Sequence, residues 1–222
     1  MISALDALAR LREGNRRFIR GDGGRDPFIG QARRQQLLEG QDPFAIVLGC
    51  SDSRVPTEII FDQGLGDLFV IRVAGNVVAP SQVGSVEFAA DQFGTRLVVV
   101  LGHSGCGAVS ATLAELVRPS EARSPNLREI VDRIRPSVEP LLAGEHQPNP
   151  SDLLSRAVRA NVLASADHLR HGSSILEGLI RNNGLLVVGA EYSLESGVVD
   201  FFDGVPKGST AQESGSSRRP PG

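Results

Sequence analysis

Residues 97–106 read LVVVLGHSGC, an apolar run over residues 97–102 that a histidine and a cysteine follow. A short run that is apolar throughout and rich in valine is typical of a strand buried on both faces of a parallel sheet. Two similar runs, at residues 44–49 and 68–73, precede it. Residues 81–93 lie between the second and third runs and carry apolar side chains at helical spacing, as a crossover helix does. Strand, helix and strand in this order predict a parallel sheet, and therefore an α/β fold.

The rest of the chain predicts one domain built around that sheet. With 222 residues, of which 41% are hydrophobic, the chain is near the upper size for a single core. We expect a single α/β domain over residues 1–205, with a mostly parallel central sheet flanked by helices, a helical arm at 1–40 and a C-terminal β-hairpin at one edge. The hairpin strands are expected at 185–190 and 198–202. Further helices are expected, in chain order, at 4–20, 30–39, 108–117, 125–142, from 151 onward and at 174–181.

The end of the chain differs in composition from the rest. Residues 206–222 consist mainly of glycine, serine, proline and charged residues. Such a segment cannot bury enough apolar surface to offset the entropy lost on ordering. We therefore expect residues 206–222 to form a disordered tail.

The composition excludes several classes of function. A net charge of −3 provides no basic surface for nucleic acid, and no run approaches the roughly 18 apolar residues of a membrane span. A small neutral or anionic partner fits better. Residues 1–18 alternate apolar and charged positions without the apolar centre of a secretory signal, so we expect a cytoplasmic protein. Disulfides are rare in that compartment, which favours metal-binding or catalytic roles for the two cysteines.

Candidate metal ligands follow two of the predicted strands. Cys50 comes directly after the first apolar run, and His103 and Cys106 follow the third. In open parallel sheets, ligands bind outside the carboxyl ends of the strands, so these side chains are expected to meet there. Thiolate sulfur and imidazole nitrogen are the ligands that zinc prefers, and three protein ligands leave the fourth position open for water. The spacing therefore predicts a catalytic Zn²⁺ site.

An acidic and a basic residue stand next to the first cysteine. Two thiolates cancel the charge of Zn²⁺, so a neighbouring group has to tune the bound water. Asp52 could accept a hydrogen bond from zinc-bound hydroxide, or could become the fourth ligand in a closed state. Arg54 can bind that carboxylate through two parallel hydrogen bonds and hold it away from the metal. The pair is expected to gate the site, and the expected helix start at Cys106 should favour its thiolate.

Other interpretations of these residues stay open at this point. Both cysteines could be inert core residues. Zinc could be structural, with Asp52 as a permanent fourth ligand. A zinc hydroxide in a narrow apolar pocket could hydrolyse carbon disulfide or carbonyl sulfide. A redox dithiol is disfavoured because Cys50 and Cys106 lack the C-x-x-C spacing.

Several motifs together resemble the β-class carbonic anhydrases. They are Cys50-x-Asp52-Ser53-Arg54, His103-x-x-Cys106, Glu13-Gly14-Asn15, Asp62-Gln63-Gly64, Arg72-x-Ala74-Gly75-Asn76, Gly84-Ser85-x-Glu87 and Asn161-Val162. The resemblance implies reversible hydration of carbon dioxide to bicarbonate and a proton, by attack of zinc hydroxide. It implies one Zn²⁺ per subunit on Cys50, His103 and Cys106, with Asp52 and Arg54 beside it.

The resemblance also implies an assembly and a substrate pocket. It implies a homodimer or homotetramer with the active-site cleft between subunits and the N-terminal helix packed on the partner. Gln41 matches a glutamine that is contributed across the dimer. Phe69 and Ala74 match apolar positions that line the carbon dioxide pocket. Phe88 stands where plant-type members have a tyrosine, so it lacks a hydroxyl that could carry protons.

Overall fold

A five-stranded sheet forms the centre of the computed structural model, which describes residues 2–22, 30–119, 124–143 and 149–207. The strands lie in the order β2-β1-β3-β4-β5, and the first four are parallel to their neighbours. Their bounds are Ala45–Gly49 (β1), Leu68–Arg72 (β2), Leu97–His103 (β3), Leu186–Tyr192 (β4) and Val199–Asp203 (β5). Strand β5 pairs antiparallel with β4 at the edge. The predicted single domain, with a mostly parallel sheet and an edge hairpin, is confirmed.

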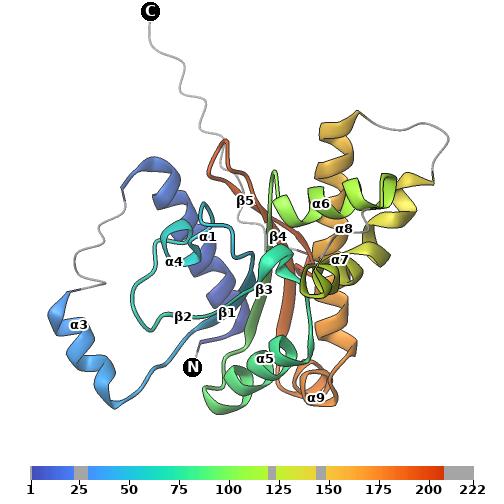
Figure 1. Cartoon of the computed structure of the whole chain (residues 1–222). Helices are drawn as coiled ribbons and strands as arrows, with labels where there is room; N and C mark the ends of the chain where they lie inside the picture. Colours follow the sequence, from blue (N-terminus) through green and yellow to red (C-terminus); the bar gives the residue numbers. More distant parts are fainter. Residues whose placement is uncertain (1, 23–29, 120–123, 144–148, 208–222) are drawn as a thin grey trace, which may run out of the picture.

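Helices cover both faces of the sheet (Figure 1). One face packs on α1 and α4, and the other on α5, α8 and α9. A third cluster joins α6, α7 and α8 at the carboxyl ends of the strands. The bounds are Ala4–Arg20 (α1), Gln31–Gln36 (α3), Leu37–Glu39 (η1), Thr57–Ile60 (α4), Ala74–Asn76 (η2), Pro80–Gln92 (α5), Gly107–Val117 (α6), Pro125–Val138 (α7), Glu139–Leu142 (η3), Pro150–His171 (α8) and Ser174–Asn182 (α9). Among the helices of these ranges, none combines the length and hydropathy needed to cross a bilayer.

Strand β1 shows why the central strands are apolar throughout. Ala45 and Val47 belong to the core beneath α1, whereas Ile46 and Leu48 belong to the core beneath α5 and α8. All four side chains are fully buried. A strand covered on both faces has no solvent side, so its sequence cannot alternate between apolar and polar residues.

Helix α1 packs on the sheet of its own chain. The hydroxyl of Ser3 caps its first turn by accepting a hydrogen bond from the Asp6 N–H. Gly14 lies so close to the backbone of Phe61 that a Cβ there would be 1.8 Å from the carbonyl oxygen. Asn15, which is 4% exposed, donates to the carbonyls of Ile60 and Gly197 and accepts from the Val199 N–H. These contacts fix α1 to its own chain.

The rest of the N-terminal arm makes fewer contacts. Neither α3 nor η1 has a buried residue. Residues 23–29 of the predicted arm lie outside the described ranges. The prediction that residues 1–40 pack on a partner subunit is not tested by one chain and stays a prediction. The predicted disorder of the tail falls, from residue 208 onward, outside the described ranges as well.

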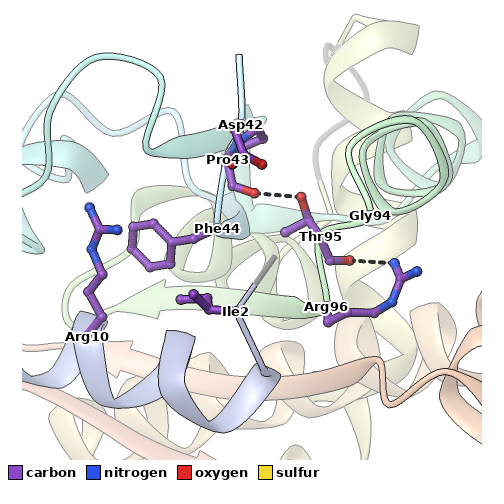
Figure 2. Close-up of a pocket in the computed structure, with 8 residues that line it drawn as sticks. All are labelled: Ile2, Arg10, Asp42, Pro43, Phe44, Gly94, Thr95 and Arg96. Carbon is purple, nitrogen blue, oxygen red and sulfur yellow. Dashed lines mark hydrogen bonds between the residues drawn. The ribbon is translucent and has the colours of Figure 1, made fainter.

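The two ends of the sheet differ in chemistry. At the amino ends of β1 and β3 lies a cavity of about 120 Å³ (Figure 2). Its arginines are engaged: Arg10 stacks on the Phe44 ring and pairs with Asp67, and Arg96 donates to the carbonyls of Ala90 and Thr95. The cysteines and His103 lie at the opposite, carboxyl end. Because the chain passes from β1 to β2 on one side and then to β3 on the other, β1 and β3 form the switch point where ligands bind in such sheets.

Candidate metal centre

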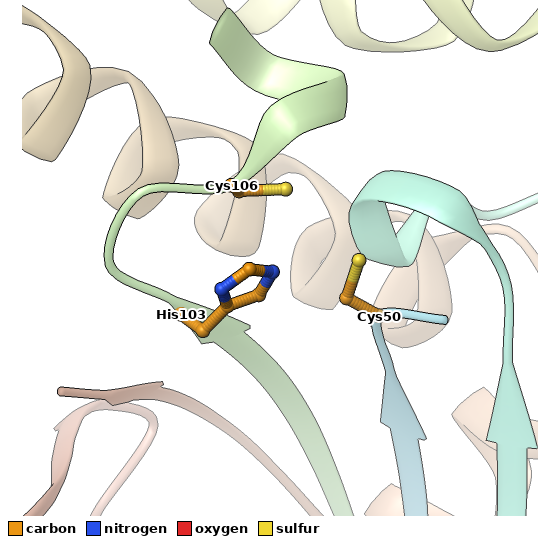
Figure 3. A group of neighbouring side chains, drawn as sticks. All are labelled: Cys50, His103 and Cys106. Carbon is orange, nitrogen blue, oxygen red and sulfur yellow. The ribbon is translucent and has the colours of Figure 1, made fainter. Parts of the chain in front are cut away.

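Three potential ligands meet at this switch point (Figure 3). Cys50 directly follows β1, His103 ends β3 and Cys106 is the N-cap of α6. One sulfur or nitrogen atom from each lies within 4.8 Å of the other two, and all three residues are at least 96% buried. The expectation that these side chains meet is confirmed by this geometry.

The ring of His103 is oriented by its own loop. Its Nδ1 lies 3.0 Å from the Ser104 carbonyl oxygen, which can only accept, so Nδ1 carries the proton. The Nε2 atom is buried and has no hydrogen-bond partner in the described part of the chain. It therefore presents a lone pair to the two sulfurs. A buried lone pair without a donor is costly unless it binds a cation, and the ligand set fits Zn²⁺.

The two thiols influence each other strongly. The Cys106 thiol hydrogen-bonds to the Cys50 sulfur and, with nearby backbone N–H groups, lowers the pKa of Cys50 to about 4. The same contact and burial raise the pKa of Cys106 above its ordinary value. The backbone N–H groups of Ala108 and Val109, at the start of α6, lower the pKa of Cys106 as expected. Between the two thiols alone, however, the hydrogen bond to Cys50 and burial outweigh these N–H groups. A second thiolate here requires a cation beside it.

Asp52 and Arg54 form a complete ion pair. Arg54 donates from Nε to Oδ1 at 2.9 Å, from Nη2 to Oδ2 at 2.7 Å and from its backbone N–H to Oδ1 at 3.0 Å. This pairing holds the pKa of Asp52 well below its usual range. The Oδ2 atom lies 3.8 Å from His103 Nε2. Asp52 is thus next to the ligand cluster while being bound to Arg54.

The sequence profile of the carbonic anhydrase family matches residues 45–199, from the first strand to the beginning of the last. The chain belongs to the β-class carbonic anhydrase family. The predictions of this family and of a carbonic anhydrase enzyme are therefore confirmed. Members of the family are zinc-dependent in general and hydrate carbon dioxide, and this carbonic anhydrase has residues that could hold the metal.

Known relatives cover most of the chain. Carbonic anhydrase 2 of Mycobacterium tuberculosis is 40% identical over 196 residues, which are 86% of this chain and 89% of that protein. A carbonic anhydrase of Mycolicibacterium smegmatis is 48% identical over 132 residues, 60% of this chain and 63% of that protein. The crystal structure of a β-carbonic anhydrase from Aspergillus fumigatus is 27% identical, with a TM-score of 0.70, and covers 90% of this chain and 91% of its own. Both the family and the fold extend over nearly all of this carbonic anhydrase.

The expected substrate residues separate into two groups. Ala74 begins η2 at the cluster, and its neighbour Gly75 donates an N–H to the Cys50 sulfur at 3.3 Å. Phe69 pairs with Ile46, four residues before Cys50, or about 13 Å along the strand. Its ring contacts Phe88 and Phe93, at centroid distances of 6.3 and 6.0 Å.

Gln41 lies still farther from the metal ligands. It precedes β1, whereas Cys50 follows it. Within one chain the structure brings Ala74 to the cluster, but not Gln41, Phe69 or Phe88. Their roles as substrate residues of this carbonic anhydrase stay predictions.

Hydrogen bonds from two residues at the centre were not predicted from the sequence. Arg72 ends β2 and donates from Nε to the Cys50 carbonyl at 2.9 Å and from Nη2 to the Asp52 carbonyl at 2.6 Å. Gly75 donates to the Cys50 sulfur. Both belong to the Arg72-x-Ala74-Gly75-Asn76 motif. The motif could have pointed to these residues. Their hydrogen bonds to Cys50 and Asp52, however, depend on the orientation of backbone N–H and carbonyl groups, which residue types do not specify.

Proposed function

We propose that this chain catalyses the reversible hydration of carbon dioxide to bicarbonate and a proton, with one Zn²⁺ held by Cys50, His103 and Cys106. The observation that carries the proposal is the buried Nε2 lone pair of His103, directed at two sulfurs at the switch point of the sheet. When bound, zinc would act as a Lewis acid that lowers the pKa of water toward 7. Three protein ligands leave one position for that chemistry.

Asp52 and Arg54 are proposed to control access to the fourth position. The ion pair keeps Asp52 ionised, so its carboxylate can only accept hydrogen bonds. With both oxygens held by Arg54, Asp52 is a fixed acceptor beside the ligand cluster. If Asp52 left Arg54 and turned toward His103, it would occupy the fourth position and stop turnover. The arrangement described above, with the ion pair intact, is the one that supports activity.

A second copy of the chain is proposed to complete the substrate pocket, in a homodimer or homotetramer. Gln41 lines a hollow of about 350 Å³ together with Leu38 and Phe93. Leu38 is 84% exposed and Phe88 is 53% exposed, although both side chains are large and apolar. An exposed apolar surface of this kind is typical of an interface. Across such an interface, Gln41, Phe69 and Phe88 of one subunit would face the metal centre and Ala74 of the other.

A stopped-flow assay of carbon dioxide hydration tests the proposal on zinc-loaded protein between pH 6.5 and 9. Activity is expected, and metal analysis should find one zinc per chain. Zinc binding without activity at any pH would indicate a structural site. Activity only on carbon disulfide or carbonyl sulfide would retain the metal centre and change the substrate. Absence of bound metal would favour the redox dithiol.

A further inference from the structure

A buried side chain on α8 is linked to the Cys50 sulfur through one glycine. Asn161 is 2% exposed, and its Nδ2 donates to the Gly75 carbonyl at 2.7 Å. The Gly75 N–H in turn donates to the Cys50 sulfur at 3.3 Å. Asn161 belongs to a motif that the sequence analysis noted and that the proposed mechanism does not use.

Gly75 has little freedom at this point. Its φ of 67° is in the left-handed region, which favours glycine. A Cβ there would lie 2.8 Å from the Ile134 Cδ1 and 3.1 Å from the Ala108 Cβ. The glycine is therefore enclosed by α6 and α7. Its two hydrogen bonds, one at its carbonyl and one at its N–H, fix the orientation of the two peptide groups that flank it.

A neighbouring contact provides a natural comparison. Ser165 lies one turn after Asn161 on α8, is 4% exposed and donates to the Asn76 carbonyl at 3.1 Å. The two side chains thus hold successive carbonyls of η2. Of the two residues they hold, Gly75 is the one whose N–H reaches the sulfur.

We propose that Asn161 is a positioning residue of the metal centre, which aims the Gly75 N–H at the Cys50 sulfur and so limits how strongly that sulfur donates electrons to the metal. An N–H hydrogen bond withdraws electron density from a thiolate, and groups that orient metal ligands in this way tune both affinity and reactivity. The inference rests on the proposed function in one respect, namely that Cys50 is a metal ligand.

The test compares Asn161→Leu, which keeps the approximate shape but removes the donor, with Ser165→Ala. In the cobalt(II)-substituted protein, the thiolate-to-cobalt charge-transfer band of Asn161→Leu should move to longer wavelength, because the sulfur becomes more electron-rich. Zinc affinity, measured by competition with a chromophoric chelator, should fall by about 10-fold to 100-fold, because the loss of a fixed orientation at the Cys50 sulfur outweighs its stronger donation. Ser165→Ala should leave the band in place and the affinity within about twofold, since its bond does not lead to the sulfur. Asn161→Ala is a second donor-free variant if the leucine variant does not fold.

Two results would overturn the inference while leaving the proposed function intact. One is an unmoved band with unchanged zinc affinity in the folded donor-free variant. The other is an equal change in Ser165→Ala, which would make Asn161 a structural residue only. A wild-type cobalt protein without any thiolate charge-transfer band would instead refute the metal centre itself, and the inference with it.

Discussion

Replacing Gly102 by alanine should disturb both the core and the metal centre. Gly102 precedes His103 on β3, and a Cβ there would lie 2.5 Å from the Val162 Cγ2 and 3.2 Å from the Val158 Cγ1. Both valines are at most 1% exposed, and a valine in a helix has essentially one χ1 rotamer, so neither can turn away. Since carbon atoms pack best at about 3.5 to 4.0 Å, α8 has to move outward by about 1 Å.

This displacement has a predictable cost. Overpacking of a dense core costs about 1–3 kcal/mol. For a chain of this size, a loss of about 2 kcal/mol lowers the unfolding temperature by about 4–8 °C. Asn161 is next to Val162 and moves with α8, so carbon dioxide hydration should decrease as well. Thermal unfolding measures the loss of stability, and zinc analysis and the stopped-flow assay measure the disturbance of the metal centre.

Two further variants make this reasoning refutable. Gly178 lies inside α9 with no atom within 4 Å of its would-be Cβ, so Gly178→Ala should stabilise the chain by about 0.5–1 kcal/mol. Val162→Ala opens the space that the new methyl needs, so it should be less harmful when combined with Gly102→Ala. The close approach of α8 does not exclude a methyl group at position 102 if Gly102→Ala unfolds at the wild-type temperature. The same holds if its effect simply adds to that of Val162→Ala.

Four other outcomes are expected. Cys106→Ser should lose its zinc, whereas metal analysis that still finds one zinc per chain would exclude Cys106 as a ligand. Asp52→Ala should keep zinc but lose most hydration activity, and a fully active variant would make the ion pair structural. Activity should rise from pH 6.5 to 9 as the closed form gives way to the open one, and a flat rate would rule out the gate. Asp52 itself stays ionised throughout this range, because Arg54 keeps its pKa well below it. Removing zinc with a chelator should lower the unfolding temperature, since an ion at 1,000 times its Kd adds about 4 kcal/mol to stability, and an unchanged temperature would contradict tight binding to the folded chain.

The sheet could be predicted from the sequence because doubly covered strands are apolar throughout. Residues 44–49 and 97–102 were predicted as strands, and the structure has Ala45–Gly49 and Leu97–His103. The meeting of Cys50, His103 and Cys106 followed from their places after neighbouring parallel strands. These conclusions depend only on patterns local to the chain and on a general rule of such sheets.

The remaining features depend on distances that residue types do not give. The helix-start argument treated Cys106 alone, whereas the hydrogen bond to a second sulfur, together with burial, raises the pKa of Cys106 against the effect of the helix start. The hydrogen bond from Gly75 to Cys50 depends on a left-handed backbone that only the folded loop defines. Gln41 and Phe69 were matched by resemblance, and their distance from the cluster became visible only once the strand register was known.

The ligands of the centre are attached to the ends of two adjacent core strands, β1 and β3, and to the first turn of α6. Folding of the sheet therefore fixes the backbone of all three ligands, and the entropy of arranging them is lost when the chain folds, not when the ion binds. Such a rigid scaffold imposes its own coordination geometry on the metal. Ions such as Mg²⁺, which require an octahedron of oxygen ligands, are excluded by the fold as well as by the soft sulfur atoms.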